Sequence, residues 1–293
     1  MPELPDIDVY VDVIKKKLIG KRIDALRFGN PFVLRSIEPE PGECAGARVI
    51  DARRVGKRIA LRLDNDLWIV MHLMIAGRFE WRDRAPMLTA KNRIASIDFE
   101  HGALLVTEAG TKKRASIHIV DGEAGVERHN PGGLEPLEID LEAFASAIRQ
   151  ENHTLKRSLT DPRILSGIGN AYSDEILHAA RLSPVKLSQS LTDREIGRLY
   201  KSVRAILTEW RTRLKAEAGG EMPTRVTAFR PGMRVHGRYG KPCPVCDSPV
   251  QRIRTKDSET NYCAACQNES RILKDRSLSR LLKEDWPKTL DDL

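Results

Sequence analysis

Two pairs of cysteines near the end of the chain constrain its fold more than any other feature of the sequence. Cys243-Pro-Val-Cys246 is followed by sixteen residues and then by Cys263-Ala-Ala-Cys266. This spacing is typical of a structural zinc site with four thiolate ligands, in which each pair sits on a tight turn. One structural Zn²⁺ is therefore expected at these four cysteines; four unrelated buried cysteines are the alternative. A redox role for either pair is disfavoured, because two pairs at this spacing form a closed site.

The length and charge of the chain narrow the classes of protein to which it belongs. With 293 residues it is long enough for two or three domains. Lys and Arg total 49 and Asp and Glu total 41, which gives 49 − 41 = +8 and makes a polyanion such as nucleic acid the first candidate partner. No apolar run approaches the roughly 20 residues that span a bilayer, and the N-terminus lacks the pattern of a secretion signal.

The spacing of apolar residues changes along the chain and predicts an α+β multidomain protein. An amphipathic helix over Asp6–Leu18 precedes short β-branched runs typical of a sandwich or barrel, within a unit spanning residues 1–130. Apolar spacing of three and four predicts a helical unit over 131–220. The cysteine-containing segment occupies 221–267, and residues 268–293 are expected to form a charged helical extension.

A glycine-rich turn lies inside the predicted helical unit. Gly167-Ile-Gly-Asn170 separates two helical stretches, and Asn170 is a good N-cap for a helix that begins near Ala171. Such a helix N-terminus can bind a phosphate, and the preceding Lys156 and Arg157 favour that function. The alternative is a turn that only connects two packed helices.

The segment between the cysteine pairs is long enough for a two-stranded hairpin. It carries Arg252, Arg254 and Lys256, which a hairpin would present to a phosphate backbone. A solvated surface is the alternative for these cations.

The N-terminus offers an unusual reactive group. Pro2 follows the initiator Met, and removal of Met1 would leave a secondary amine, which can condense with a sugar aldehyde carbon to form an iminium. Glu3 is placed to move protons, and Asp6 lies one helical turn onward. A proline that merely leads into the helix is the alternative.

Five segments in a fixed order carry a resemblance to a known family. They are Met1-Pro-Glu-Leu-Pro-Asp-Ile-Asp8, Gly56-Lys-Arg58, His72-Leu-Met-Ile-Ala-Gly77, the turn from Gly167 to Tyr172, and the four-cysteine segment. Over residues 1–267 the chain resembles the formamidopyrimidine-DNA glycosylase / endonuclease VIII family of base-excision repair enzymes.

The resemblance implies a fold, an activity and a set of site residues. The fold would be an N-terminal helix with a β-sandwich, a helix–two-turn–helix domain and a zinc ribbon, with kinked DNA in the cleft between them and the damaged base flipped out. Pro2 would attack C1′, Glu3 would donate a proton, and Lys57 would bind a phosphate or assist proton transfer. Glu175 would support the site. The residues placed on DNA are His72, Ile75, Arg114, Lys156, Asn170, Tyr172, Arg254, Lys256 and Ser258.

Three positions depart from the family pattern. Ser258 stands where an arginine usually lies, five residues before the third cysteine. Ile75, beside Met74, occupies the position of a wedge residue that is commonly Met. The loop Thr107–Ser116 contains cations but no aromatic residue.

The favoured hypothesis is a bifunctional DNA glycosylase with lyase activity on abasic sites, acting as a monomer on damaged double- or single-stranded DNA. A bacterial-type cytoplasmic, nucleoid-associated location is expected. The alternative is a catalytically weak or inactive family member that binds damaged or bent DNA; retention of Pro2 and Glu3 favours the enzyme. A transcription regulator is disfavoured, because it would need neither the N-terminal octapeptide nor Lys57.

Overall fold

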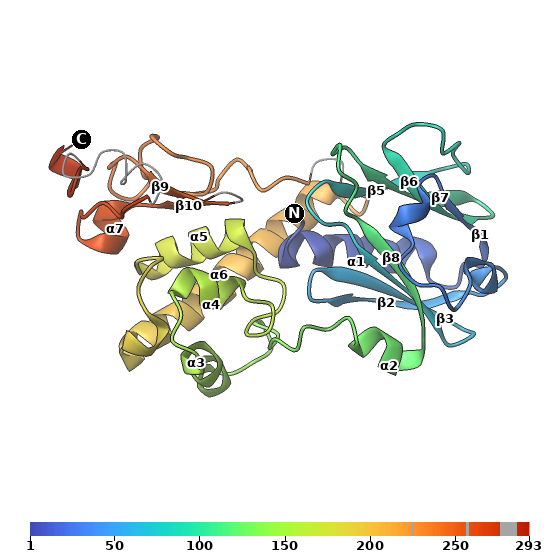
Figure 1. Ribbon diagram of the computed structural model, residues 1–293, viewed down its shortest axis with the longest axis horizontal. Helices are drawn as coiled ribbons and strands as arrows, with labels where there is room; N and C mark the ends of the chain where they lie inside the picture. The colour runs from blue at the N-terminus through green and yellow to red at the C-terminus, as the bar shows by residue number, and fades with distance from the viewer. Residues whose placement is uncertain (224–225, 256–257, 276–285, 293) are drawn as a thin grey trace. The chain divides into compact units, whose positions relative to one another are not determined.

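The computed structural model describes residues 1–223, 226–255, 258–275 and 286–292 (Figure 1). The chain divides into two compact units, one made of Met1–Pro131 with Trp210–Thr227 and the other of Gly132–Glu209 with Ala228–Leu293. The long helix α6, Asp193–Ala218, contributes residues to both units. The four-part division at residues 130, 220 and 267 stays a prediction.

The first unit is a β-sandwich with an N-terminal helix, as expected. Helix α1 spans Leu4–Leu18, and the short helix α2 spans Gly122–Glu127. One antiparallel sheet has the order β1-β6-β7-β5, made of Ile23–Phe28, Arg93–Phe99, Gly102–Glu108 and Gly77–Arg82. The other has the order β2-β3-β4-β8, made of Val49–Val55, Arg58–Leu63, Leu67–His72 and Ser116–Asp121.

The apolar face of α1 belongs to the core of this sandwich. Ile7, Tyr10, Ile14 and Leu18 recur at intervals of three and four, and each is 0% exposed. The ring of Tyr10 meets Phe79 of β5 edge-on, with 5.2 Å between centroids. Each fully buried side chain of this size contributes roughly 1.5–3 kcal/mol. This packing fixes the helix, and with it the residues at its N-terminal end.

The second unit is helical and carries the ribbon. Its helices are α3 Leu141–Arg149, α4 Leu155–Thr160, α5 Asn170–Ala180 and the first part of α6. The hairpin expected between the cysteine pairs is present as β9 Gln251–Arg254 and β10 Glu259–Tyr262, which pair antiparallel, and it is followed by α7 Ala264–Asn268.

The glycine-rich turn differs in detail from the prediction. Helix α5 begins at Asn170, and its N-cap is Gly169 rather than Asn170. Gly167 uses the left-handed region with φ +78°, whereas Gly169 is extended. Asn170 does not cap the helix because its side chain is held elsewhere, by the hairpin described below.

The helical extension predicted for residues 268–293 is wrong for the part that the structure describes. Arg271 pairs with Thr289 in an isolated β-bridge, and the Leu290 N–H donates to the Ser270 carbonyl. A short 3-10 turn covers Leu290–Asp292. Charge and composition favoured a helix, but the backbone near residue 270 pairs with the backbone near residue 290 instead.

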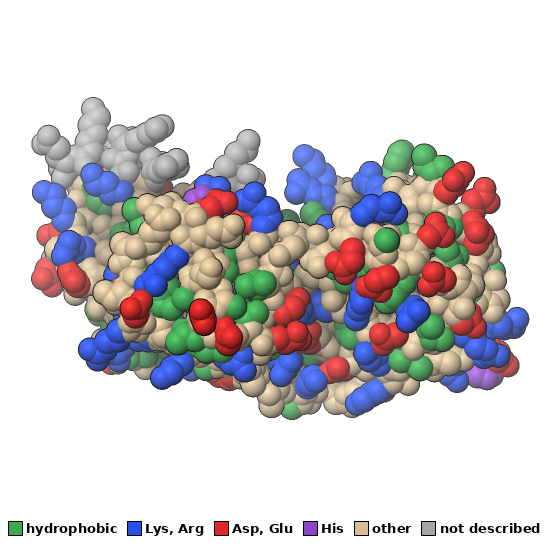
Figure 2. All heavy atoms as spheres, turned by 90° about the horizontal axis from the view of Figure 1, so that it is seen from below, with side chains coloured by type: hydrophobic (Ala, Val, Ile, Leu, Met, Phe, Trp, Pro, Cys, Tyr) green, Lys and Arg blue, Asp and Glu red, His purple; other side chains and the backbone are tan. Residues whose placement is uncertain are grey.

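Charges of both signs are mixed on one face of the chain. On the face drawn in Figure 2, Lys and Arg side chains are interspersed with Asp and Glu side chains. The net charge of +8 is therefore not gathered into one patch on this face. Among the described residues, no helix has the length and apolar character needed to cross a membrane.

Candidate functional site

Glu3 lies at the start of α1, where it caps the helix. Its backbone N–H donates to Oδ2 of Asp6 at 2.9 Å, and its own carboxylate faces the Asp6 N–H in a reciprocal capping box. Both side chains are buried, with Glu3 4% and Asp6 6% exposed. The local sequence thus fixes a buried carboxylate directly beside Pro2, which is also buried.

The N-terminal amine is in an environment that disfavours its charged form. Burial lowers the pKa of the Met1 ammonium; Glu3 and Asp6 act in the opposite direction, and Arg78 and Lys57 add to the lowering. The Pro2 nitrogen lies one residue further along. An amine with a lowered pKa is more often deprotonated near neutral pH, which is the nucleophilic form.

Two cations, one in a turn and one in a strand, bring positive charge toward the N-terminal end of the chain. Lys57 occupies the two-residue turn between β2 and β3, where Gly56 takes φ +60°. Arg78 lies in β5, and its guanidinium donates to the carbonyl oxygens of Ile75, at 3.1 Å, and Val226. The sequence analysis predicted Lys57 but not Arg78. The only sequence feature that pointed to Arg78 was its position directly after the His72–Gly77 segment.

A glycine-closed turn exposes Ile75. The Gly77 N–H donates to the Leu73 carbonyl at 2.8 Å, and Met74 takes φ +51°. A Cβ at Gly77 would lie 2.2 Å from the Leu73 oxygen, so only glycine closes the turn without a shift. Ile75 is 60% exposed at its tip. An exposed apolar side chain on a tight turn has the form of a wedge between base steps.

His72 lies at the end of β4 among other basic groups. Burial, followed by the charges of Arg58 and Lys57, lowers its pKa to about 4, so the ring is neutral near pH 7. Its Nε2 atom is buried and has no hydrogen-bond partner in the described residues. The Arg58 guanidinium donates to the His129 carbonyl at 3.0 Å, and the rings of His118 and His129 lie 4.4 Å apart. In this cluster the Arg58 guanidinium, rather than the neutral imidazoles, offers positive charge to an anion such as a phosphate.

The loop that carries Arg114 is tied to one buried carboxylate. Glu108, 1% exposed, accepts the backbone N–H of Arg114 at 3.0 Å and that of Ala115 at 3.2 Å. The Lys113 ammonium donates to the Glu108 carbonyl. The Arg114 side chain itself is exposed. The loop thus presents a cation from a fixed backbone.

In the second unit, Asp174 joins three segments of the chain. Its Oδ1 atom accepts from Lys156 Nζ of α4 at 2.5 Å. Its Oδ2 atom lies 2.7 Å from His236 Nδ1 and accepts the Asn261 N–H of the hairpin at 3.0 Å. Lys156 also donates to the Asn170 carbonyl at 2.8 Å. Sequence reasoning found Lys156 but neither Asp174 nor His236, since residues 62 apart show no spacing signal.

The helix that follows the glycine-rich turn anchors the ribbon. Asn170 Nδ2 donates to the Glu259 carbonyl at 2.8 Å. Glu175, 1% exposed, accepts three successive backbone N–H groups, from Arg234 at 2.8 Å and from Val235 and His236 at 2.9 Å. Burial raises the Glu175 pKa, and these N–H groups oppose that rise. Tyr172 is 2% exposed, inside the unit, and its contact with DNA stays a prediction.

The hairpin cations have different surroundings. Arg254 is exposed, while its backbone N–H donates to Asp275 at 2.6 Å. Arg252 stacks over the Tyr239 ring at 4.1 Å and pairs with Glu259 at 3.3 Å, so it has a structural role. Ser258 is exposed, and its hydroxyl lies 2.8 Å from Thr255 Oγ1. Lys256 lies outside the described residues.

The four cysteines converge at one point, as the spacing predicted. Their sulfur atoms all lie within 4.8 Å of one another, and three pairs are separated by 3.4, 3.5 and 4.0 Å. Zn–S bonds of about 2.3 Å in a tetrahedron put sulfurs about 3.8 Å apart, so the set fits one zinc ion. Burial raises the pKa of Cys263 and, to about 11, that of Cys266. Four thiolates at this spacing therefore need a cation, and the closed ligand set indicates a structural one.

Three family models match consecutive parts of the chain. Residues 1–114 match the formamidopyrimidine-DNA glycosylase N-terminal domain, residues 133–216 match the H2TH domain of the same enzymes, and residues 240–268 match a zinc finger found in FPG and IleRS.

Individual proteins match over nearly the same extent. The chain is 30% identical over 275 residues to the formamidopyrimidine-DNA glycosylase of Rickettsia africae, covering 91% of this chain and 99% of that one. It is 26% identical over 279 residues to the enzyme of Listeria innocua, covering 91% and 100%. The crystal structure of MutM (FPG) from Thermus thermophilus superposes with a TM-score of 0.76 at 26% identity, covering 91% and 98%. A Lactococcus lactis enzyme bound non-covalently to DNA with an AP site has a TM-score of 0.79 at 22% identity, covering 91% and 99%, and supports the fold.

Proposed function

Because the chain belongs to the formamidopyrimidine-DNA glycosylase family, we propose that it excises a damaged base from DNA and then cleaves the strand at the abasic site. The observation that carries this proposal is the buried Pro2-Glu3 pair at the start of α1. A protein that only bound DNA would have no need for a secondary amine at a buried position directly beside a buried carboxylate.

The proposed reaction begins with the nitrogen of Pro2 after removal of Met1. The nitrogen lone pair forms a bond to C1′, and the bond from C1′ to the base breaks, so that the base leaves with the electron pair and takes a proton. Glu3 delivers a proton to the sugar ring oxygen as the ring opens to the iminium. Loss of a C2′ proton then expels the 3′ phosphate, and water hydrolyses the iminium to return the free amine.

The remaining predicted site residues are proposed to hold the DNA. Lys57, His72, Ile75 and Arg114 act from the first unit. Lys156, Asn170 and Arg254 act from the second. Most contribute charge or hydrogen bonds to the backbone, which position the duplex without reading its sequence. The zinc ribbon supports the hairpin, and the partner is damaged DNA bound by a single copy of the chain in the bacterial nucleoid.

Borohydride trapping on an abasic duplex tests the nucleophile. Reduction of the iminium leaves a stable covalent adduct, and digestion with mass spectrometry should locate it on Pro2. A chain whose Pro2 nitrogen is acetylated should give no adduct, because an amide nitrogen cannot attack. An adduct of undiminished yield with the blocked chain would identify a lysine as the nucleophile, with Lys57 the first candidate.

The trapping experiment also separates the enzyme from its alternative. Ser258, where the family usually has arginine, favours a chain that binds damaged or bent DNA with little catalysis. That alternative predicts specific binding to an abasic duplex, no adduct with any substrate, and no change on replacing Glu3 by Gln. The proposed enzyme predicts a slower reaction for Glu3→Gln with similar binding.

A further inference from the structure

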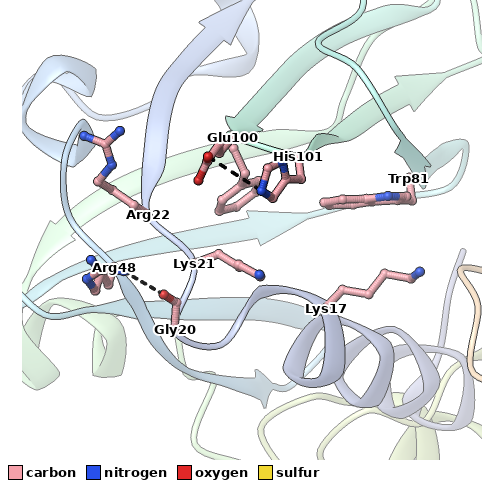
Figure 3. A pocket seen from close by; sticks show the side chains of 9 residues that line it. Lys17, Gly20, Lys21, Arg22, Arg48, Trp81, Glu100 and His101 are labelled. Carbon is pink, nitrogen blue, oxygen red and sulfur yellow. Dashed lines mark hydrogen bonds and ion pairs between the residues drawn. The ribbon is translucent and has the colours of Figure 1, made fainter.

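A pocket lies in the first unit, at the end of α1 opposite to Pro2 (Figure 3). It has a volume of about 370 Å³ and is lined by Lys17, Lys21 and Arg48 together with aromatic rings. At about 1.5 Å per residue, the helix places this pocket roughly 20 Å along its axis from the N-terminal amine. None of its residues belongs to the site proposed above.

Cations dominate the polar lining of this pocket. Lys17, Lys21, Arg22 and Arg48 line it together with a single carboxylate, that of Glu100. Lys17 pairs with Glu221 at 2.8 Å and Arg22 pairs with Asp24 at 3.3 Å. Within the described parts of the chain, Lys21 and Arg48 have no carboxylate partner for their charges. An anion in the pocket would therefore meet two uncompensated cations.

Some of the carbonyl groups at the end of α1 are paired. The C-terminal carbonyls of a helix carry partial negative charge when they are unpaired. Here the Leu18 carbonyl accepts the Lys21 N–H at 2.9 Å, and the Lys15 carbonyl accepts the Ile19 N–H at 3.4 Å. The Gly20 carbonyl accepts from Arg48 Nη1 at 3.0 Å, which is the lower dashed line in Figure 3.

An aromatic wall faces these cations. The indole of Trp81 lies across the pocket from Lys17 and Lys21, with His101 beside it (Figure 3). Trp81 stacks at a tilt on Phe99, with 6.3 Å between centroids. A Cβ at Gly102 would lie 2.3 Å from Cζ2 of Trp81, so the glycine lets the ring pack against the turn between β6 and β7. This packing holds the ring in place, with Lys17 over it.

We propose that this pocket binds a nucleoside phosphate whose base is not paired, either as a free mononucleotide or as a nucleotide of single-stranded DNA. The base stacks on Trp81, and the phosphate binds Lys21 and Arg48, a combination that single-strand binding proteins use without sequence preference. Lys17, now 5.8 Å from the Trp81 centroid, yields the ring face to the base and turns toward the phosphate. The volume lies within the range of small-ligand sites.

Calorimetry on the full, zinc-loaded chain tests the proposal. The catalytic site is first saturated with a duplex that contains a tetrahydrofuran abasic analogue. Deoxyadenosine monophosphate and a single-stranded oligothymidylate are then titrated separately. Binding of the mononucleotide supports the free nucleotide as the ligand, and binding of the oligothymidylate alone supports single-stranded DNA.

Variants connect the binding to the pocket. Lys21→Glu and Trp81→Ala should each weaken binding about tenfold or more, while Trp81→Phe should stay close to wild type because it keeps a ring. Lys91→Glu makes the same charge change at an exposed position outside the pocket and should have no effect. Lys21 is exposed, so its replacement keeps the test valid if Trp81→Ala does not fold.

Three results would overturn the proposal. They are the absence of binding by both probes, equal weakening by Lys21→Glu and Lys91→Glu, and binding of inorganic phosphate as tight as that of the nucleotide. Borohydride trapping on an abasic duplex distinguishes the two proposed sites. Lys21→Glu should leave trapping unchanged, and blocking the N-terminus should leave nucleotide binding unchanged.

Discussion

The Nε2 atom of His178 lies 3.3 Å from the Sγ atom of Cys243, which joins helix α5 to the zinc site. His178 is 3% exposed, and burial lowers its pKa to about 4, so the ring is neutral near pH 7. A neutral imidazole protonated on Nε2 donates to a zinc-bound thiolate and stabilises its charge. Helix α5 also carries Asp174, which binds Lys156, so one helix contacts both the metal site and Lys156.

His178→Phe should weaken zinc binding about tenfold, because it removes a hydrogen bond to a ligand while filling the space. The measurement is transfer of zinc to a chromophoric chelator. His178→Gln, which keeps an N–H donor the same number of bonds from Cα, should retain zinc better than His178→Phe. Equal zinc transfer from wild type and His178→Phe would show that this contact does not support the site.

Asp174→Asn should destabilise the fold by about 3 kcal/mol, because it leaves Lys156 and His236 beside a neutral group in a buried site. The side chain of Asp174 is 0% exposed and has three partners. Asp193→Asn is the matched control, since its carboxylate is 96% exposed and pairs with Arg149 at the surface. Its expected effect is below about 1 kcal/mol. Urea unfolding measures both, and similar losses would contradict the role given to Asp174.

Acid should destabilise the first unit through two half-buried histidines. Burial and neighbouring cations lower the pKa values of His72 and His118 to about 4. The unfolded chain binds protons at these residues below about pH 6.5, whereas the folded chain does so only near pH 4, so stability falls as pH drops through this window. Above it, neither state is protonated and the groups have no effect.

Replacement of His118 by Asn removes one of the two histidines and should reduce the loss of stability at acid pH. Urea midpoints at pH 7.5 and pH 5 should differ less for His118→Asn than for wild type. His101→Asn, whose side chain is 77% exposed, should lose as much as wild type. An unchanged difference for His118→Asn would argue against the effect of burial.

Local patterns made much of this fold predictable. The cysteine spacing determined the ribbon, since four ligands and a hairpin are set within a short segment. The interval between Ile7, Tyr10 and Ile14 determined which face of α1 is buried. In each case the partners lie within one or two elements of each other.

Contacts between distant segments were not predictable in the same way. The guanidinium of Arg78 donates to the Val226 carbonyl, 148 residues away, and no periodic sequence pattern predicts that contact. Asn is a preferred residue type at N-caps, but the side-chain amide of Asn170 donates a hydrogen bond to the Glu259 carbonyl of the hairpin. Tertiary hydrogen bonding outweighed the local preference there.

Ser258 has a defined role in the hairpin turn. Its hydroxyl lies 2.8 Å from Thr255 Oγ1, and its carbonyl accepts the Thr255 N–H at 2.8 Å. A serine hydroxyl cannot make the two-pronged contact with phosphate that an arginine makes, nor does it supply charge. At the position where the resemblance implies an arginine, the chain thus has a residue that stabilises the turn.

Without the arginine contact, the substrate preference should shift toward lesions whose nucleotides need few protein contacts to stay flipped out. Wild type should act faster on single-stranded abasic DNA than on a duplex with 8-oxoguanine opposite cytosine, because an unstacked nucleotide costs less to flip. Ser258→Arg should tighten binding to the damaged duplex about tenfold, corresponding to roughly 1.4 kcal/mol for a charge-assisted contact. Ser258→Lys adds the charge without the planar fork, so a smaller gain is expected from it. Single-turnover rates and affinities on both substrates decide the matter. A wild-type preference for the 8-oxoguanine duplex, or no response to Ser258→Arg on either substrate, would mean that other residues hold the flipped nucleotide.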